Sequence, residues 1–315
     1  MSSIEAGNAA AAESDATDER VNALLVGAID MHCHSGPSVM PRMIDHIEAL
    51  QEASDAGMRA LLFKDHFYSA TPVTALLSSH YRHLDVTMLS GVPLNDTSGG
   101  LNPYAVDHGL KLGARLVWMP TFSAANHIRQ NRNGHMLPTT TPMRRPKMLT
   151  VIDEDGRIKD EVKEILDQIA EFDAVLSAGH LHISEIWALF EEAEKRGVTR
   201  RLVQHPTYTI GATYKDIAEL AAGGAFIEHS LCMFIPDSRF QYYPSAELRD
   251  VIDAGGTEQT ILGSDLGQVD NPTPVRGFRS VIRLCIALGF DDATIRRLIG
   301  GNAARLLNLQ QHAPT

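Results

Sequence analysis

The feature that most constrains the fold is a series of eight short apolar segments distributed along the whole chain. Each segment is rich in Val, Ile, Leu and Ala and is nearly continuous instead of alternating with polar residues, which is typical of strands buried on both faces of a parallel sheet. We therefore predict eight parallel strands, at residues 24–30, 59–64, 85–92, 114–119, 173–179, 201–204, 224–229 and 260–264.

Helical patterns lie between these segments, for example "MIDHIEALQEASDAG", "DEVKEILDQIAEF" and "ISEIWALFEEAEKRG". Several of them end at a glycine, a common helix stop. This alternation predicts an α/β protein of one domain, a (β/α)8 TIM barrel over residues 21–309. A doubly wound open sheet is the main alternative, but no glycine-rich phosphate loop follows the first strand.

Two segments do not fit the strand-and-helix repeat. The first 20 residues are small, polar and acidic and lack the basic start and apolar stretch of a signal peptide, so we predict a disordered tail over residues 1–20. The connection over about residues 121–160 is too long for a simple turn and contains "PTTTPMRRPK". We predict a lid-like insertion there, after the fourth strand and near the active site.

Charge and composition exclude several classes of partner. The chain has 28 Lys and Arg against 39 Asp and Glu, a formal net charge of −11, so we expect no nucleic-acid binding. No apolar run is long enough to span a membrane. The three cysteines are odd in number and widely spread, which predicts no disulfide framework and fits the cytoplasm. The sequence is compatible with a homo-oligomer but does not identify an interface.

Polar residues follow most of the predicted strands. Five of the eight strand ends carry histidine and a sixth carries aspartate, and the carboxyl ends of the strands are where TIM barrels place their chemistry. Imidazole and carboxylate are the ligands that suit zinc and similar ions, so the pattern predicts a metal site. The strand-end residues are His32 and His34, Lys64 and His66, Asn95, His180, His205, His229 and Asp265.

The spacing within the first strand end supports this prediction. His32 and His34 are two residues apart, so both side chains lie on the same side of an extended chain and reach one ion. Cys33 between them is expected to point to the opposite side and pack in the core.

These motifs together carry a family resemblance. "DMHCHSGP", "SAGHLH", "VQHP", "LGSD" and the closing "GGNAARLL" occur in the order typical of the metal-dependent amidohydrolase superfamily, which the chain resembles over about residues 28–308. The resemblance implies a distorted barrel that holds one or two divalent ions, zinc or alternatively manganese. It implies that His32 and His34 bind the more buried ion and His180 and His205 the more exposed one, and that Asp265 contacts the first ion and shuttles protons.

The fourth strand departs from that family pattern. Many two-metal members bridge their ions with a carboxylated lysine or a glutamate from this strand, but "VWMPTF" offers neither. Lys64 in "LLFKDH" is the substitute we predict, since a lysine buried beside cations is disfavoured as an ammonium and could form a bridging carbamate. The alternatives are that Lys64 stays an ammonium and binds substrate, or forms a salt bridge with Asp65.

The predicted activity is hydrolysis of a small molecule by a metal-activated water. The bond cleaved would be an amide, cyclic amide or ester bond, and we expect a non-peptide C–N bond first. Asp265 would act as general base and then general acid, and His229 or Lys64 would help to stabilise the oxyanion. A metal-dependent decarboxylase or other lyase is the alternative, followed by a lactonase or phosphotriesterase and by a non-catalytic ligand-binding barrel.

Candidate substrate-binding residues come from several strand ends and loops. Arginines on loops suit a carboxylate through bidentate pairing, which brings in the lid residues Arg144 and Arg145. The substrate-binding residues that we predict are His66, Arg42, Asn95 and Tyr208.

Overall fold

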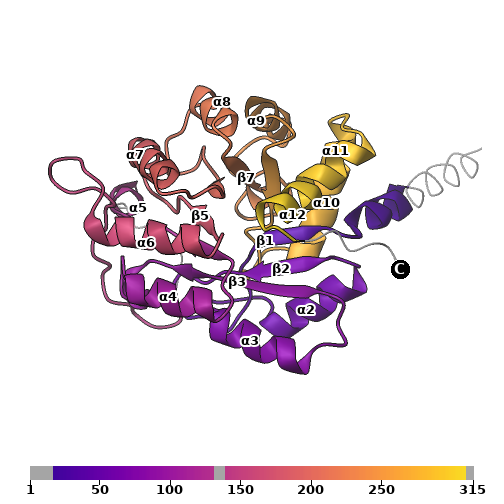
Figure 1. Cartoon of the computed structure of the whole chain (residues 1–315). Coiled ribbons are helices and arrows are strands. Elements are labelled where there is room, and N and C mark those ends of the chain that lie inside the picture. The colour runs from indigo at the N-terminus through magenta and orange to yellow at the C-terminus, as the bar shows by residue number, and fades with distance from the viewer. Residues whose placement is uncertain (1–16, 131–138, 310–315) are drawn as a thin grey trace, which may run out of the picture.

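The computed structural model describes residues 17–130 and 139–309. Within these ranges the chain forms eight parallel strands that neighbour one another in sequence order around a barrel (Figure 1). The predicted TIM barrel is thereby confirmed. The strands are β1 (Ile29–Cys33), β2 (Ala60–Phe63), β3 (Thr87–Pro93), β4 (Leu116–Trp118), β5 (Val175–Ser177), β6 (Arg201–Gln204), β7 (Phe226–Ser230) and β8 (Thr260–Gly263).

The barrel closes between β1 and the residues that follow β8. The backbone N–H of Asp265 donates to the carbonyl of His32 at 2.9 Å, and the N–H of His34 donates to the carbonyl of Leu266 at 2.8 Å. The closing hydrogen bonds therefore join the two chain segments that were predicted to supply metal ligands.

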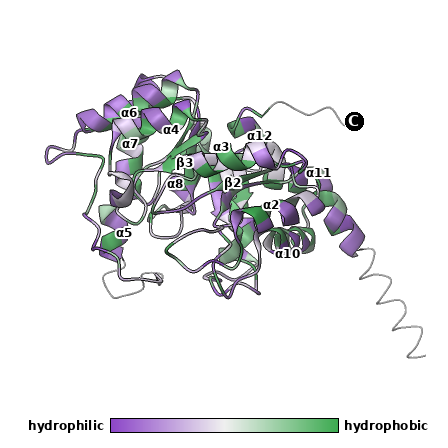
Figure 2. Ribbon diagram, turned by 90° about the horizontal axis from the view of Figure 1, so that it is seen from below, coloured by the Kyte–Doolittle hydropathy of each residue, from purple (hydrophilic) through white to green (hydrophobic). Residues whose placement is uncertain are grey.

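Helices surround the strands, and their outer sides carry many polar residues, as along α6 and α11 in Figure 2. The helices with defined bounds are α2 (His46–Asp55), α3 (Thr71–His80), α4 (Pro103–Lys111), α5 (Ala125–Gln130), α6 (Asp160–Glu171), α7 (Ile183–Lys195), α8 (Tyr214–Ala222), α9 (Glu247–Gly255), α10 (Pro274–Ala287), α11 (Asp292–Arg296) and α12 (Asn302–Leu306). No helix within the described residues is long and apolar enough to cross a membrane.

The N-terminal segment differs from its prediction. Residues 17–25 are helical, so four residues assigned to the tail and the start of the first apolar run belong to a helix. Val21, Leu24 and Leu25 are buried in the outer core, and Arg20 pairs with Asp292 at 2.6 Å. Their spacing fits one face of a helix, which explains why an apolar run here is not a strand. Residues 1–16 lie outside the described residues.

The base of the barrel is closed by the C-terminal "GGNAARLL" motif. Ala303 and Leu306 of α12 join the apolar cluster that fills the barrel interior. The Asn302 side chain donates to the carbonyls of Thr257 and Thr260 at 2.8 and 2.6 Å. This motif therefore supports the end of the barrel opposite to the histidines.

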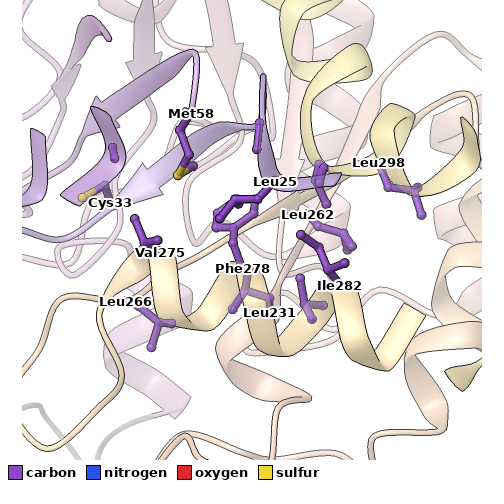
Figure 3. Close-up of a cluster of buried hydrophobic side chains, with 14 of the residues drawn as sticks. Leu25, Cys33, Met58, Leu231, Leu262, Leu266, Val275, Phe278, Ile282 and Leu298 are labelled. Atoms are coloured by element: carbon purple, nitrogen blue, oxygen red, sulfur yellow. The ribbon is translucent and has the colours of Figure 1, made fainter. Parts of the chain in front are cut away.

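A second apolar cluster lies between the strands and the helices (Figure 3). Val275, Phe278 and Ile282 of α10 pack there beside Leu262 of β8. Cys33 is fully buried in the same cluster, which confirms that its side chain points away from the barrel interior.

The long connection after β4 is tied to the barrel rim at several points. It contains α5 and continues from residue 139 as an irregular chain. The N–H of Thr140 donates to the carbonyl of Val39 at 2.7 Å, and the N–H of Leu149 donates to the carbonyl of Ser123 at 2.8 Å. The residues after 139 are thereby held at the end of the barrel where the histidines lie.

Candidate metal centre

A register shift in β1 decides which of its side chains face the barrel interior. Ile29 and Met31 face inward with the interior cluster, so regular alternation would also place Cys33 inside. The pairing of β1 with β2 shifts between Asp30 and Cys33. Beyond the shift His32 and His34 face inward, as expected for an irregularity that redirects side chains beside a site.

The buried carboxylate of Asp30 holds this irregular segment. Its Oδ1 accepts hydrogen bonds from the N–H groups of His32 and Ser264, each at 2.9 Å. Burial raises the pKa of Asp30 to about 6, against the hydrogen bonds from Ser264 and His32 that lower it. Asp30 thus fixes β1 and the end of β8 relative to each other.

Hydrogen bonds to the Nδ1 atoms determine what His32 and His34 present to the pocket. Nδ1 of His32 donates to Oε1 of Glu228 at 2.6 Å, and Nδ1 of His34 donates to the carbonyl of Lys64 at 2.9 Å. Each ring therefore keeps a lone pair on Nε2. A carboxylate or carbonyl partner behind a histidine is the usual support of a metal ligand.

The two Nε2 atoms converge on Asp265. Its Oδ1 lies 3.3 Å from Nε2 of His32 and 3.0 Å from Nε2 of His34. Within the described residues these three side chains form the one group whose ligand atoms all lie within 4.8 Å of one another. Two imidazole nitrogens and a carboxylate oxygen at these distances form a donor set that fits a divalent metal ion.

The electrostatic environment keeps His34 and the two carboxylates of the site in forms that can bind a cation. Burial lowers the pKa of His34 to about 3. For Asp265, burial alone would raise the pKa, but the neighbouring His32 and His34 outweigh it and hold the pKa well below its usual range. The pKa of Glu228 is lowered in the same way, chiefly by His32. A neutral His34 and ionised carboxylates at neutral pH suit a cation.

Lys64 reaches the same point from β2. Its Nζ lies 2.9 Å from Nε2 of His32 and 5.4 Å from the centre of the Trp118 ring, and burial lowers its pKa to about 8. Within the described residues Asp65 pairs with Arg42 at 3.1 Å and not with Lys64, so the salt-bridge alternative for Lys64 is wrong. The lysine side chain is directed toward the candidate metal ligand His32.

The histidines from four strand ends form a closed circle around the pocket. Starting from His32, the distances between successive ring centres are 5.0, 5.0, 6.0, 4.9 and 6.0 Å. Lys64, Asp265 and Tyr208 line the same pocket. The structure therefore brings together the predicted residues of this circle, which are His32, His34, His66, His180 and His205.

His180 and His205 form a looser half of the site. Nδ1 of His180 lies 2.9 Å from Nδ1 of His127, which comes from α5. The buried Nδ1 of His205 has no hydrogen-bond partner within the described part of the chain. The ring nitrogens of His180 and His205 suit a second ion. They are not part of the compact ligand group formed by His32, His34 and Asp265.

His66 is oriented by an amide and a hydroxyl. Nδ1 of His66 lies 2.9 Å from Oγ1 of Thr121, which accepts a hydrogen bond from Nδ2 of Asn95 at 2.6 Å. The Oδ1 of Asn95 accepts the N–H groups of Thr121 and Ser123 at 2.9 and 3.0 Å. Asn95 therefore holds the loop after β4 in place beside the predicted substrate-binding histidine.

Two predicted residues do not reach the pocket. Glu228 occupies the inward position of β7, so the next residue, His229, faces outward, where it is hydrogen-bonded to the backbone of Val251 and lies edge-on to Phe234. The catalytic role for His229 is corrected accordingly. The Arg42 side chain is only 4 % exposed and held by Asp65, so its role as a substrate ligand is corrected too.

Two residues of the site escaped the sequence reasoning. Glu228 is an acidic residue inside the apolar segment "GAFIEH", which indicates that its carboxylate has a buried partner. The site residue predicted for this segment was instead the neighbouring His229. His127 lies in the insertion, where no strand end places it. Its position could be found only from the contact of α5 with the end of β5.

Comparison with protein families matches residues 27–228 to DUF6282, described as a family of unknown function. The chain belongs to this family. No curated protein sequence is significantly similar to the chain.

Solved structures resemble this DUF6282 member in fold. An amidohydrolase from Pseudomonas aeruginosa is 13 % identical with a TM-score of 0.61, and the match covers 92 % of this chain and 98 % of that one. A "probable dipeptidase" from the same organism is 11 % identical with a TM-score of 0.61, covering 93 % and 98 %. A metallopeptidase described as a dipeptidase is 14 % identical with a TM-score of 0.55, covering 90 % and 98 %. The predicted resemblance is confirmed at the level of the fold.

The Glu228–His32 hydrogen bond generates a prediction. In the wild-type protein Nε2 of Gln204 donates to Oε2 of Glu228 at 3.3 Å. Glu228→Gln removes the negative charge behind His32 and places an amide N–H₂ near this Nε2 atom. We expect zinc affinity to fall about 10–100-fold while the protein stays folded. Competition titration with a zinc chelator measures this, with the exposed Glu191→Gln as control. Equal zinc affinity of wild type and Glu228→Gln would show that Glu228 does not support a ligand.

Proposed function

We propose that the protein is a metal-dependent hydrolase that cleaves an amide, cyclic amide or ester bond of a small molecule, with a non-peptide C–N bond as the first choice. The observation that carries the proposal is the convergence of Nε2 of His32, Nε2 of His34 and Oδ1 of Asp265 at one point of a histidine-lined pocket. The shared fold with amidohydrolase and dipeptidase structures supports the same reaction type.

The residues that would hold a metal are His32, His34 and Asp265, with a second position beside His180 and His205. Zinc, or alternatively manganese, would acidify a water molecule and polarise the bond to be cleaved. The site can be filled through the pocket, because Asp265 remains 17 % exposed.

Asp265 is the residue that would move the proton. Its backbone has a positive φ of 51°, an uncommon conformation that the hydrogen bond from its N–H to the carbonyl of His32 helps to maintain. The carboxylate is ionised and lines the pocket, so it can accept a proton from water and return it to the leaving group.

His66 is suited to bind the substrate as a neutral donor. Because Thr121 Oγ1 accepts from Asn95, its own hydrogen is free to be donated to Nδ1 of His66, which leaves the ring proton on Nε2. Burial holds the pKa of His66 well below its usual value. An uncharged N–H in a dry pocket stabilises charge that develops on a carbonyl oxygen.

Lys64 is the group that we propose as a carbamate between two ions. Its amine would attack carbon dioxide at carbon, form an N–C bond and release one proton to solvent. Support comes from its contact with Nε2 of His32 and from its place in the same pocket as His180 and His205.

A metal-dependent decarboxylase or other lyase is the second candidate. It stays a candidate because the compact group of His32, His34 and Asp265 fits one ion, and a site for one ion suits either reaction. The buried free thiols of Cys33, Cys232 and Cys285 support a reducing compartment, the cytoplasm, as the place of action.

The proton-transfer role of Asp265 can be tested by Asp265→Asn. The variant keeps the shape of the side chain but not its basicity, so we expect bound zinc to be retained and kcat to fall about 10²–10⁴-fold. A panel of N-acyl amino acids, lactams and esters is first screened for a substrate of the wild-type protein. The wild-type activity should be lost when the metal is removed with a chelator and should return when zinc is added. The exposed Asp253→Asn is the control. Near-normal turnover by Asp265→Asn rules out the shuttle role.

The carbamate can be tested by nuclear magnetic resonance with ¹³C-bicarbonate. We expect the zinc-loaded wild type to show a carbamate carbon signal that is absent from Lys64→Met. Activity should rise with bicarbonate after carbon dioxide has been removed. If zinc-loaded wild type shows no such signal at saturating bicarbonate, Lys64 is not carboxylated.

A further inference from the structure

A second cleft opens beside the histidine pocket. His66 and Phe122 line both cavities, with their rings stacked at a centre-to-centre distance of 3.8 Å. The barrel side of the cleft is completed by Asn95 and Asp96, among others. A molecule that fills both cavities therefore passes the rings of His66 and Phe122.

The opposite wall of the cleft comes from the insertion after β4. This wall consists of Thr139 and of residues 143–147, which include Arg144, Arg145 and Lys147. The backbone N–H of Lys147 donates to the carboxylate of Asp96. With the hydrogen bonds of Thr140 and Leu149 described above, both ends of this wall are fixed to the barrel.

The charge of this wall is opposite to that of the whole protein. The chain carries a net charge of −11, yet three cations occur within four residues here. Within the described residues no ion pair involves Arg144, Arg145 or Lys147, whereas Arg157 of the same insertion pairs with Asp155 at 3.1 Å. Asp96 is the acidic residue that lines the cleft, and its carboxylate is engaged by the Lys147 backbone.

The far side of the histidine pocket has a different character. Met233, Phe240 and Tyr242 line it, and Tyr242 stacks on Tyr208 at 4.9 Å. The two approaches to the metal ligands are thus apolar and aromatic on one side and cationic on the other. Such an asymmetry orients a substrate that has one apolar and one anionic end.

We propose that the cleft binds an oxyanion, a carboxylate or a phosphate, of a substrate whose reacting bond lies among the histidines. Arg144 and Arg145 would pair with the anion, since the guanidinium group matches both groups in bidentate geometry. The assignment of this anion to a substrate rests on the proposed function, whereas anion binding itself does not.

Calorimetric titration of the zinc-loaded protein tests the proposal. The probes are succinate, inorganic phosphate and neutral succinamide, titrated into wild type, Arg144→Gln/Arg145→Gln and Arg157→Gln. We expect succinate or phosphate to bind wild type and succinamide to bind much more weakly. The double variant should lose about tenfold in anion affinity, as for the loss of a charge-assisted pair, while Arg157→Gln should match wild type. Tighter binding of phosphate or of succinate identifies which anion the substrate carries.

Two results would overturn the proposal. One is that neither anion binds better than succinamide, and the other is that the double variant binds anions as wild type does, which would place the anion on the metal or elsewhere. Circular dichroism verifies folding of the variants, whose substituted side chains are exposed. If arginine-dependent anion binding is found but no hydrolysis is, the cleft is established and only the proposed reaction fails.

Discussion

The carboxylate of Asp30 makes the rest of the site possible. It accepts the N–H groups of His32 and Ser264 and so stabilises an irregular segment in β1 that reverses the alternation of side chains. With regular alternation Cys33 would face the interior and both histidines would face the helices. The same carboxylate ties β1 to the end of β8, which brings Asp265 to the two histidines.

Burial gives these groups their chemical character. A histidine in a dry interior loses its proton, and a carboxylate there needs a partner, which Glu228 finds in His32 at 2.6 Å. The orientation and protonation of the candidate metal ligands therefore depend on the groups that contact their far sides. The apolar interior of the barrel, closed by α12 below, keeps water from the base of the site.

The sequence predicts the barrel well because buried parallel strands leave nearly continuous apolar runs, and it predicts the histidine circle because strand ends meet at one rim. Sequence-based prediction of the site fails where the role of a residue depends on the direction in which its side chain points. His229 ends the predicted strand at residues 224–229 in the same way as other histidines end theirs, but in β7 Glu228 takes the inward position. His127 comes from a helix of the insertion, so no local pattern links it to His180. The pairing of Arg42 with Asp65 likewise depends on the folded chain.

The most direct test of the proposed metal centre is a crystal structure of the zinc-loaded protein with anomalous diffraction measured at the zinc edge. We predict a strong anomalous peak about 2.0–2.2 Å from Nε2 of His32, Nε2 of His34 and a carboxylate oxygen of Asp265. A fully loaded crystal without a peak at these three atoms, or with zinc bound only at the surface, would contradict the metal centre and the function proposed from it.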